Sequence, residues 1–354
     1  MTSLDKHSVT KDKSKTVMEE IIQGYKKYQI VLSAIEFGLF TYLHEKGPSN
    51  KEEISESLKI KGMLTKAYLQ ILTEMGLLVE HEKTYSNSNI TEEQFFQNNL
   101  DGFNWFKYSG AKNPNWNKLK DSLSQVSDDT SLPLPAPSKE YIDYLAQRSL
   151  QGEVQAITKA VMDWDGFTRA KSLLDIGEGH GWVSIALCNE NKDLTATVVG
   201  KPHIEQYIQS YQMQGRIINL GNTVPIEDIS GEFDIVLFSH YLYQHRKYLE
   251  YPFEKAYQIM KPGGLLIANH WFCEVGCGPG QDGITDLDKA FLSFGHPLCH
   301  VNTFQRFFTG QGFTLITEQD IPSVFGQSHL HVAIKKPVNT RLPDKNDSSS
   351  HCCC

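Results

Sequence analysis

Hydrophobic positions along this chain follow two different periods, one in the first hundred residues and another from about residue 170 onward. In residues 31–43 and again in residues 64–75, apolar side chains recur every three or four positions, as on one buried face of a helix. Between these stretches Gly47 and Pro48 break the pattern, and Ser49 or Asn50 can cap a short helix over residues 51–58. The first part of the chain is therefore predicted to be helical.

A two-stranded hairpin is predicted after the third of these helices. Gly76 ends that helix, and residues 77–79 and 83–85 predict the two strands of a wing. Three short helices and a wing form a winged-helix module, which in many proteins binds the major groove of DNA. The third helix offers only Lys61, Lys66 and Tyr68 as polar side chains for such contacts, and no arginine. Nucleic acid is therefore not an expected partner.

Strands alternate with helices from residue 172 onward. The predicted strands are the apolar run that ends at Asp175 and residues 194–199, 216–220, 233–238, 265–268, 314–318 and 331–335. A helix over residues 253–260 and the turn Lys261-Pro262-Gly263-Gly264 precede the fifth strand. This alternation predicts an α/β domain with a doubly wound, Rossmann-like sheet, whose ligands bind at the carboxyl ends of the strands.

The turn after the first of these strands is rich in glycine. Gly177, Gly179 and Gly181 stand at alternate positions, and a helix over residues 182–188 follows. Glycine is favoured where the backbone passes close to a ligand, because any Cβ would block the approach. The spacing differs from the dinucleotide-binding pattern, whose third glycine comes one residue later. A ligand site is predicted here, and a tight strand–helix turn without a ligand is the alternative.

The composition is that of an ordinary globular protein. Of 354 residues, 40% are hydrophobic and 21% are charged, and the formal net charge is −8. This balance gives no general basic surface for nucleic acid. No apolar run is long enough for a transmembrane helix, so a cytoplasmic location is expected.

The seven cysteines predict neither a disulfide framework nor a metal site. Cys273 and Cys277 are separated by three residues, whereas zinc knuckles favour two, and no second pair lies nearby. The chain ends in three cysteines preceded by His351, which stands where a prenylation box requires cysteine. This end is expected to be a disordered tail; lipidation, or soft-metal binding by His351 and the thiols, is the alternative.

Residues 33–89 resemble the dimerisation domain of small-molecule O-methyltransferases of the caffeate, hydroxyneurosporene and antibiotic types. Residues 175–181, Asp-Ile-Gly-Glu-Gly-His-Gly, resemble the first motif of S-adenosylmethionine-dependent methyltransferases of the Rossmann-like class. The resemblance covers about residues 20–336, through Pro262-Gly263-Gly264 and Gly312-Phe313. It implies a class I methyltransferase sheet with an antiparallel last strand, S-adenosyl-L-methionine as the cofactor, and a homodimer formed through the winged-helix module.

The domain organisation follows from these patterns. The predicted domains are residues 1–15 as a disordered N-terminus, 16–100 as the winged-helix dimerisation domain, 101–165 as connecting helices and a substrate-pocket segment, 166–337 as the S-adenosylmethionine-binding catalytic domain, and 338–354 as a disordered tail ending in cysteines. The N-terminal module also has more apolar surface than a three-helix unit can bury, which independently predicts a twofold homodimer. The residues that supply this excess are Ile35, Phe37, Leu39 and Phe40.

The resemblance also implies a set of cofactor-binding residues. They are Asp175, Gly177, Glu178, Gly179, Gly181, Gly200, Asn222, Thr223 and Ser239. Several depart from the family pattern. Gly200 stands where an acid accepts hydrogen bonds from the ribose hydroxyls, Ser239 where a basic residue stands, and Glu178 where glycine is usual. Asn222 matches an acid near the adenine amine, and an amide oxygen can still accept there.

The catalytic histidine of the family, which precedes Asp-Trp, aligns with Tyr243. A tyrosine is a poor base near neutral pH, because its ordinary pKa is about 10. His240 lies three residues before this position and His245 two after it, so a shifted histidine can serve; each can also be a packing or surface residue. His240 is favoured because it lies nearer to the carboxyl end of the strand over residues 233–238.

Three functions are compatible with these features. The predicted one is S-adenosylmethionine-dependent O-methylation of a small aromatic or polyketide-like hydroxyl compound. The second is a divergent member that keeps the fold without methyl transfer, such as a decarboxylase, a hydroxylase or a cyclisation catalyst. The third is a winged-helix regulator that responds to a ligand, which the glycine turn and the weak basic face disfavour.

Overall fold

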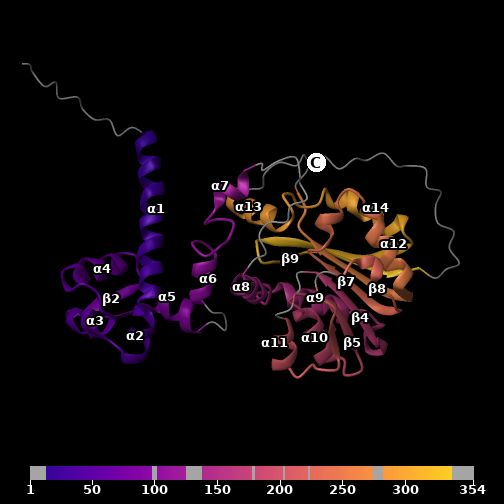
Figure 1. The fold of residues 1–354 in the computed structure, drawn as a ribbon, viewed down its shortest axis with the longest axis horizontal. Coiled ribbons are helices and arrows are strands. Elements are labelled where there is room, and N and C mark those ends of the chain that lie inside the picture. The colour runs from indigo at the N-terminus through magenta and orange to yellow at the C-terminus, as the bar shows by residue number, and fades with distance from the viewer. Residues whose placement is uncertain are drawn as a thin grey trace, which may run out of the picture. The chain divides into compact units, whose positions relative to one another are not determined.

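The computed structural model describes residues 13–97, 102–124, 138–177, 180–201, 204–221, 224–273 and 282–336. The chain divides into two compact units, Met1–Asp128 and Asp129–Cys354, which are considered separately (Figure 1). Among the described residues, no helix combines the length and apolar character needed to cross a membrane.

The first unit contains the predicted wing and the helices predicted over residues 51–58 and 64–75. Its helices are α1 (Lys13–Glu36), α2 (Leu39–Lys46), α3 (Lys51–Leu58), α4 (Gly62–Glu74), α5 (Asn89–Glu92), the π-helix η1 (Glu93–Gln97), α6 (Gly102–Tyr108) and α7 (Leu119–Leu123). Its strands β1 (Ser49–Asn50), β2 (Leu78–His81) and β3 (Thr84–Asn87) form a sheet in the order β1-β3-β2. Helix α3 has the predicted bounds because the Asn50 side chain accepts hydrogen bonds from the N–H groups of Glu52 and Glu53.

The apolar stripe of residues 31–43 does not form one helix, as its period had suggested. Gly38 adopts φ 72°, in the left-handed region that glycine tolerates, and separates α1 from α2. The bend turns Leu39 and Phe40 into the core of this unit, where both are fully buried. Helical spacing on both sides of such a bend is indistinguishable in sequence from one continuous helix.

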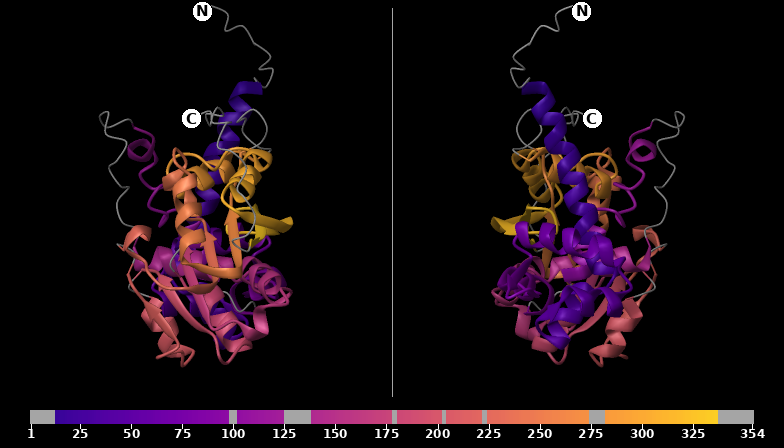
Figure 2. Two further views of the ribbon diagram at one scale, coloured as in Figure 1. Left: turned by 90° about the vertical axis from the view of Figure 1, so that its right-hand side faces the viewer. Right: turned by 90° about the vertical axis from the view of Figure 1, so that its left-hand side faces the viewer.

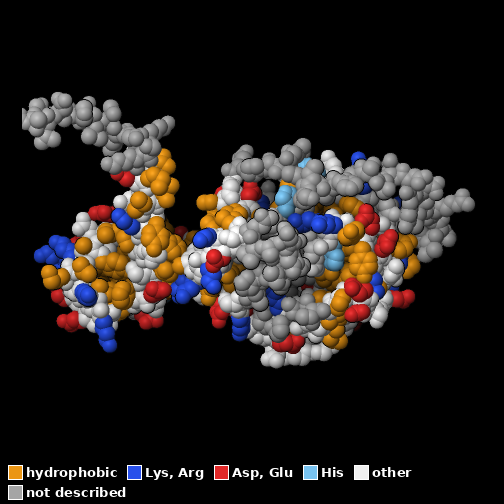
Figure 3. Space-filling view, turned by 45° about the horizontal axis from the view of Figure 1, so that its top comes forward, with side chains coloured by type: hydrophobic (Ala, Val, Ile, Leu, Met, Phe, Trp, Pro, Cys, Tyr) orange, Lys and Arg blue, Asp and Glu red, His pale blue; other side chains and the backbone are white. Residues whose placement is uncertain are grey.

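The apolar surface of the first unit lies elsewhere than predicted. Of the four residues expected to supply it, only Phe37 is substantially exposed, at 45%. Exposed apolar side chains instead line the N-terminal half of α1, which extends beyond the rest of this unit (Figures 1 and 3). They are Val17, Met18, Ile21, Ile22 and Tyr25, here called the α1 apolar face.

The second unit is the predicted doubly wound α/β domain. Its helices are α8 (Lys139–Ser149), α9 (Glu153–Met162), η2 (Phe167–Arg169), α10 (Trp182–Glu190), α11 (Ile204–Ser210), η3 (Ile226–Asp228), η4 (Leu242–His245), α12 (Glu250–Ile259), α13 (Gly283–Leu292) and α14 (Val301–Gly310). Its strands are β4 (Ser172–Gly177), β5 (Thr195–Val199), β6 (Ile217–Asn219), β7 (Phe233–Ser239), β8 (Met260–His270), β9 (Phe313–Pro322) and β10 (Gln327–Lys335). The sheet order is β6-β5-β4-β7-β8-β10-β9, and β10 runs antiparallel to both neighbours, so the expected antiparallel last strand is confirmed.

Helices lie on both sides of this sheet (Figure 2), and an apolar layer packs on each of its two faces. Leu173 and Leu174 are neighbours on β4, yet they belong to different layers, because successive side chains of a strand point to opposite faces. Helices α9, α10 and α11 pack on the face of Leu173, whereas α12 and α14 pack on the face of Leu174. The sheet is therefore buried on both sides, and its carboxyl edge is the natural place for a ligand.

The prediction that Lys261-Pro262-Gly263-Gly264 forms a turn before the fifth strand is wrong, because these residues lie inside β8. Phe233 of β7 pairs with Met260 and Ile235 pairs with Leu265, so β8 holds extra residues at a bulge between these pairs. Gly263 has φ 77° within this bulge. Pro-Gly-Gly indicates a turn in most sequences, but here pairing with β7 continues on both sides of it.

Candidate active site

The glycine turn joins β4 to α10 at the carboxyl edge of the sheet. Gly177 pairs with Ser239 of β7, and a Cβ on Gly177 would lie 2.4 Å from the Ser239 carbonyl oxygen. Gly181 has φ 67° and precedes α10, where a Cβ would lie 2.2 Å from Ile204 Cδ1. Gly177 is therefore required by packing against the backbone of β7, whereas Gly181 is favoured by its left-handed φ, because the end of the Ile204 side chain can move. Glu178 and Gly179 lie outside the described residues.

Asp175, on β4 just before this turn, links the strand to the helix that follows the turn. Its side chain is buried, and its Oδ2 accepts a hydrogen bond of 2.7 Å from the Ser184 hydroxyl on α10. Burial raises the pKa of Asp175, while the Ser184 hydrogen bond opposes this change. The residue therefore ties the first turns of α10 to β4 and positions the turn.

The ends of β5 and β6 are joined by a residue that the sequence reasoning did not select. Asn219 Oδ1 accepts hydrogen bonds from the N–H groups of Gly200, at 3.2 Å, and Gly221, at 3.1 Å. Because this oxygen already has two donors, Asn219 does not replace the acid that the family places at Gly200. Asn222 and Thr223 lie outside the described residues.

A buried chain of polar side chains begins at His240, directly after β7. His240 Nε2 lies 2.7 Å from Glu153 Oε1, and His240 Nδ1 lies 2.7 Å from Tyr243 Oη. A carboxylate only accepts, so Nε2 carries the hydrogen, and Nδ1 accepts the hydrogen of the tyrosine hydroxyl. The exposed fractions of Glu153, His240 and Tyr243 are 3%, 8% and 1%, so this carboxylate–imidazole–phenol chain is shielded from water.

Three further groups hold this chain in place. Asn269 Nδ2 donates to Glu153 Oε1 at 2.6 Å, and Ser328 Oγ donates to Asn269 Oδ1 at 2.7 Å. The backbone N–H of Trp271 donates to Tyr243 Oη at 2.7 Å. The second carboxylate oxygen of Glu153, Oε2, is buried without a hydrogen-bond partner. A buried acceptor of this kind is costly unless a ligand or water satisfies it.

His240 is held in an uncommon backbone conformation. Its φ is 52°, in the left-handed region, and its N–H donates to the Asn269 carbonyl at 2.8 Å. Strain of this kind persists where surrounding contacts enforce it, and it is frequent at functional sites. The chain in this order can move a proton from a phenol to an imidazole beside a carboxylate, as in the hydroxyl–imidazole–carboxylate triads of hydrolases.

The structure brings His240 and Tyr243 together and gives His245 other partners. His245 Nε2 lies 3.0 Å from the Tyr241 hydroxyl, at the end of η4. Burial lowers the pKa of His245, and Glu227 opposes this change. A lowered pKa makes His245 a weaker base than an exposed histidine.

Comparison with known proteins places this site in a family. Residues 19–93 match the sequence profile of the O-methyltransferase dimerisation domain, and residues 174–268 match that of a methyltransferase domain. The chain thus contains an O-methyltransferase dimerisation domain followed by a methyltransferase domain. His240 and Tyr243 lie within the matched methyltransferase domain, whereas Glu153 precedes it in the chain.

Individual relatives are distant in sequence but match most of the length of this chain. A 3-hydroxy-5-methyl-1-naphthoate 3-O-methyltransferase of Streptomyces sahachiroi is 24% identical over 318 residues, covering 84% of this chain and 87% of that protein. An N,N-dimethyltransferase of Streptomyces rimosus is 21% identical over 337 residues, covering 89% and 95%. The solved structure of an O-methyltransferase family protein from Burkholderia thailandensis superposes with a TM-score of 0.72 at 17% identity, covering 92% and 98%.

Sequence reasoning missed Glu153, Asn269 and Ser328. Glu153 is the first residue of α9, where an acid is ordinarily explained by the helix dipole. It is 87 residues from His240 in the chain, so no local spacing links the two. Their contact shows that the start of α9 lies beside the end of β7, which tertiary structure alone brings about.

His270 is a second buried histidine of this region. Its Nε2 accepts hydrogen bonds from the N–H groups of Tyr241, at 3.2 Å, and Leu242, at 3.1 Å. Burial holds the pKa of His270 well below its ordinary value, and the neighbouring His240 and His331 lower it further. At mildly acidic pH the imidazole of His270 therefore stays neutral in the folded protein, whereas it is protonated in the unfolded chain.

Stability is accordingly expected to fall as the pH is lowered from 7.5 to 5. Below about pH 6.5, His270 binds a proton in the unfolded state but stays neutral in the folded state. This difference lowers the free energy of unfolding by up to about 2 kcal/mol at pH 5. Urea unfolding at both pH values measures this loss in the parent and in His270→Gln, whose amide oxygen can accept from the same N–H groups. The variant should lose about 2 kcal/mol less. An equal loss in both proteins would assign the acid sensitivity to other groups.

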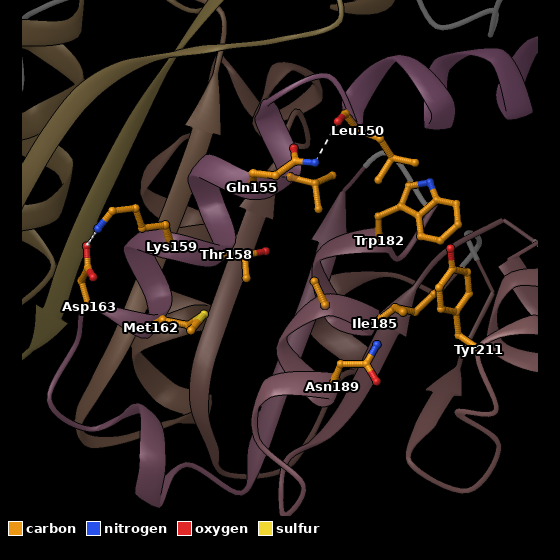
Figure 4. Close-up of a pocket in the computed structure, with 12 residues that line it drawn as sticks. Leu150, Gln155, Thr158, Lys159, Met162, Asp163, Trp182, Ile185, Asn189 and Tyr211 are labelled. Atoms are coloured by element: carbon orange, nitrogen blue, oxygen red, sulfur yellow. Dashed lines mark hydrogen bonds and ion pairs between the residues drawn. The ribbon is translucent and has the colours of Figure 1, made fainter. Parts of the chain in front are cut away.

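A separate pocket of about 470 Å³ lies between α9 and α10 (Figure 4). Its lining residues are Leu150, Val154, Gln155, Thr158, Lys159, Met162, Asp163, Trp182, Ile185, Ala186, Asn189 and Tyr211. None of the predicted site residues lines it. The pocket is therefore lined by other side chains than those of the glycine turn and the buried chain, although Trp182 directly follows Gly181.

Proposed function

We propose that this protein transfers a methyl group from S-adenosylmethionine to a hydroxyl oxygen of a small aromatic compound. The observation that supports this most is the buried Glu153–His240–Tyr243 chain at the carboxyl end of β7. Tyr243 occupies the position of the family's catalytic histidine, and the neighbouring His240 supplies the imidazole that this position lacks.

The carboxyl edge fits the cofactor in one part and departs from the family in another. Gly177 and Gly181 form a turn into the N-terminus of α10, whose backbone N–H groups suit an anionic carboxylate. The proposed cofactor-binding residues of the turn are Gly177, Glu178, Gly179 and Gly181. Those outside it are Asp175, Gly200, Asn222, Thr223 and Ser239. Gly200 offers no carboxylate to the ribose, so charge-assisted hydrogen bonds of about 1.5–3 kcal/mol each are missing there. When bound, S-adenosylmethionine supplies a methyl group activated by its sulfonium.

The protein's own part is to remove the proton of the substrate hydroxyl. In the proposed step, Tyr243 Oη accepts this proton as it passes its own to His240 Nδ1. The imidazolium that forms is stabilised by Glu153 at its Nε2 side, and the Trp271 N–H holds Tyr243 Oη in position for the two proton transfers. Tyr243 is thus the catalytic residue, while His240 and Glu153 act through it.

The substrate class is proposed from the relatives and the chemistry together. The naphthoate enzyme of Streptomyces sahachiroi is named for methylation of an aromatic hydroxyl, and the Streptomyces rimosus relative is named for methylation of nitrogen. A proton relay is needed for a hydroxyl and less so for a neutral amine, whose lone pair is already available. The Glu153–His240–Tyr243 chain therefore favours oxygen as the acceptor.

A labelled-methyl assay tests this proposal. The protein is incubated with S-adenosylmethionine carrying a labelled methyl group and with paired naphthols, hydroxybenzoates and the matching arylamines. Label in the hydroxyl compounds supports the proposal, and label in the arylamines alone would assign N-methylation instead. Label in neither set, with the cofactor bound, would favour a member that keeps the fold without methyl transfer.

We also propose that two copies of the chain associate through the α1 apolar face. Its residues recur at helical spacing, and the match to a dimerisation domain begins within it, at residue 19. A single chain leaves these side chains about half exposed; Ile21, for example, is 61% exposed. Burial of this stripe against a second copy removes it from water.

Light scattering is expected to give twice the chain mass of 40.1 kDa at micromolar concentration. The double variant Met18→Lys and Ile21→Lys should shift the protein to a single-chain mass, because it places charges in the centre of the α1 apolar face. Ile284→Lys, which charges an exposed apolar residue of α13, serves as the control and should keep the dimer. A single-chain mass for the parent protein would contradict the proposal.

A further inference from the structure

A cluster of metal-ligating side chains lies on the hairpin of β9 and β10, outside the site described above. Glu318 pairs directly with His331 in the strand register, and His329 lies two residues away on the same face of β10. His329 Nε2 is 3.8 Å from Glu318 Oε2, and His331 Nε2 is 3.9 Å from the same oxygen. One ligand atom from each of the three residues lies within 4.8 Å of the others.

The two imidazoles have nitrogen atoms that the protein leaves without hydrogen bonds. His331 is fully buried, yet neither of its ring nitrogens has a partner. His329 Nδ1 lies 2.8 Å from Asp320 Oδ1, so Nδ1 carries the hydrogen and the lone pair is on Nε2. That Nε2 is also buried and unpaired. Buried polar atoms are nearly always satisfied, so two such nitrogens directed at one carboxylate require an explanation.

We propose that Glu318, His329 and His331 bind a divalent transition metal ion, and that zinc suits them best. Two imidazoles and one carboxylate are a common ligand set for zinc. Donors about 2.1 Å from a tetrahedral ion lie about 3.4 Å from one another, so closure on the ion needs only small side-chain movements from the present spacing.

The surroundings of the cluster are those of a metal site. Asp320 holds the far side of the His329 ring, and histidine ligands almost always donate their second N–H to such a carboxylate or carbonyl. The Gln305 amide donates to Glu318 Oε2 and fixes that side chain.

The position of the cluster indicates what the ion would do. Glu318 is 40% exposed, so the ion would have solvent or another donor at an open position. His331 packs against Phe304 and Phe308 of α14, with ring centroids 5.1 and 5.3 Å away. An ion bound here would join β9 to β10 and fix both to α14. This role is independent of methyl transfer, so failure of either proposal leaves the other unaffected.

Metal titration of the full chain tests the inference. The C-terminal thiols would compete for zinc, so Cys352, Cys353 and Cys354 are first replaced by serine to give the reference protein. After chelation, zinc is titrated in competition with a chromogenic chelator, and cobalt is titrated while its visible absorption is recorded. The expected result is one zinc ion per chain, with a tetrahedral cobalt spectrum that lacks thiolate charge-transfer bands.

Four variants of this reference protein locate the site. Glu318→Gln and His329→Gln should each weaken zinc binding at least about tenfold, and Asp320→Asn should weaken it about 10- to 100-fold through loss of the outer carboxylate. His44→Gln removes another surface histidine–carboxylate pair, with Glu92 at 2.7 Å, and should bind like the reference. Zinc should raise the melting temperature of the reference and not of Glu318→Gln, provided that the two melt alike without metal. Substoichiometric binding, or equal affinity in all variants, would overturn the proposal.

Discussion

Replacement of His240 with glutamine is expected to lower turnover at least about a hundredfold while leaving the affinity for S-adenosylmethionine unchanged. The amide can still donate to Glu153 and accept from Tyr243, so the buried chain keeps partners, but an amide cannot take up a proton. The rate loss should therefore come from lost proton transfer. Steady-state kinetics on an authentic substrate measure it, together with calorimetric titration of the cofactor.

Two comparisons separate this role from a structural one. The acid limb of the pH–rate profile, which reports a proton acceptor, should be present in the parent protein and absent in the glutamine variant. His245→Ala is the matched control, because His245 contacts the Tyr241 hydroxyl rather than the Glu153–His240–Tyr243 chain, and it should retain most of its turnover. Full turnover by His240→Gln would show that deprotonation does not pass through this imidazole.

Replacement of Gly179 with valine is expected to abolish cofactor binding without loss of cooperative folding. Gly179 is the middle glycine of the turn whose ends, Gly177 and Gly181, are constrained by contacts with Ser239 and Ile204. If the backbone between them passes under the methionine part of the cofactor, a branched side chain blocks that approach. Calorimetric titration with S-adenosylhomocysteine measures the loss, and thermal unfolding checks that the fold is intact.

Gly310→Val provides the matched control for this substitution. Gly310 ends α14, and a Cβ there meets no atom within 4 Å, so the same chemical change is made away from the proposed site. This control should bind the cofactor like the parent protein. Near-normal affinity of Gly179→Val would remove the basis for placing the cofactor at this turn.

The elements of this fold could be predicted from sequence where the signal is local. Helix α3 has its predicted bounds because Asn50 caps it, and the sheet strands follow apolar runs bounded by turn residues. Helical period alone could not show that Gly38 divides α1 from α2, because the apolar spacing continues across the bend. Local sequence around Pro-Gly-Gly predicts a turn, because it cannot show that pairing with the neighbouring strand β7 continues on both sides of the segment.

The candidate site could be predicted only in part for the same reason. The glycine turn and His240 lie beside strand ends, which sequence can locate. Glu153 is 116 residues from Asn269, and Glu318 belongs to a different strand from His329, so tertiary structure alone brings these groups together. Local reasoning about cysteines likewise gave no indication of the histidine and carboxylate cluster on β9 and β10.

The most direct test of whether this chain is an S-adenosylmethionine-dependent methyltransferase is calorimetric titration. The purified protein is titrated with S-adenosylmethionine and with S-adenosylhomocysteine. We expect saturable binding of both compounds at one site per chain, with each displacing the other. Binding should persist in His240→Gln and disappear in Gly179→Val. If the folded parent protein binds neither compound saturably, it is not an S-adenosylmethionine-dependent methyltransferase.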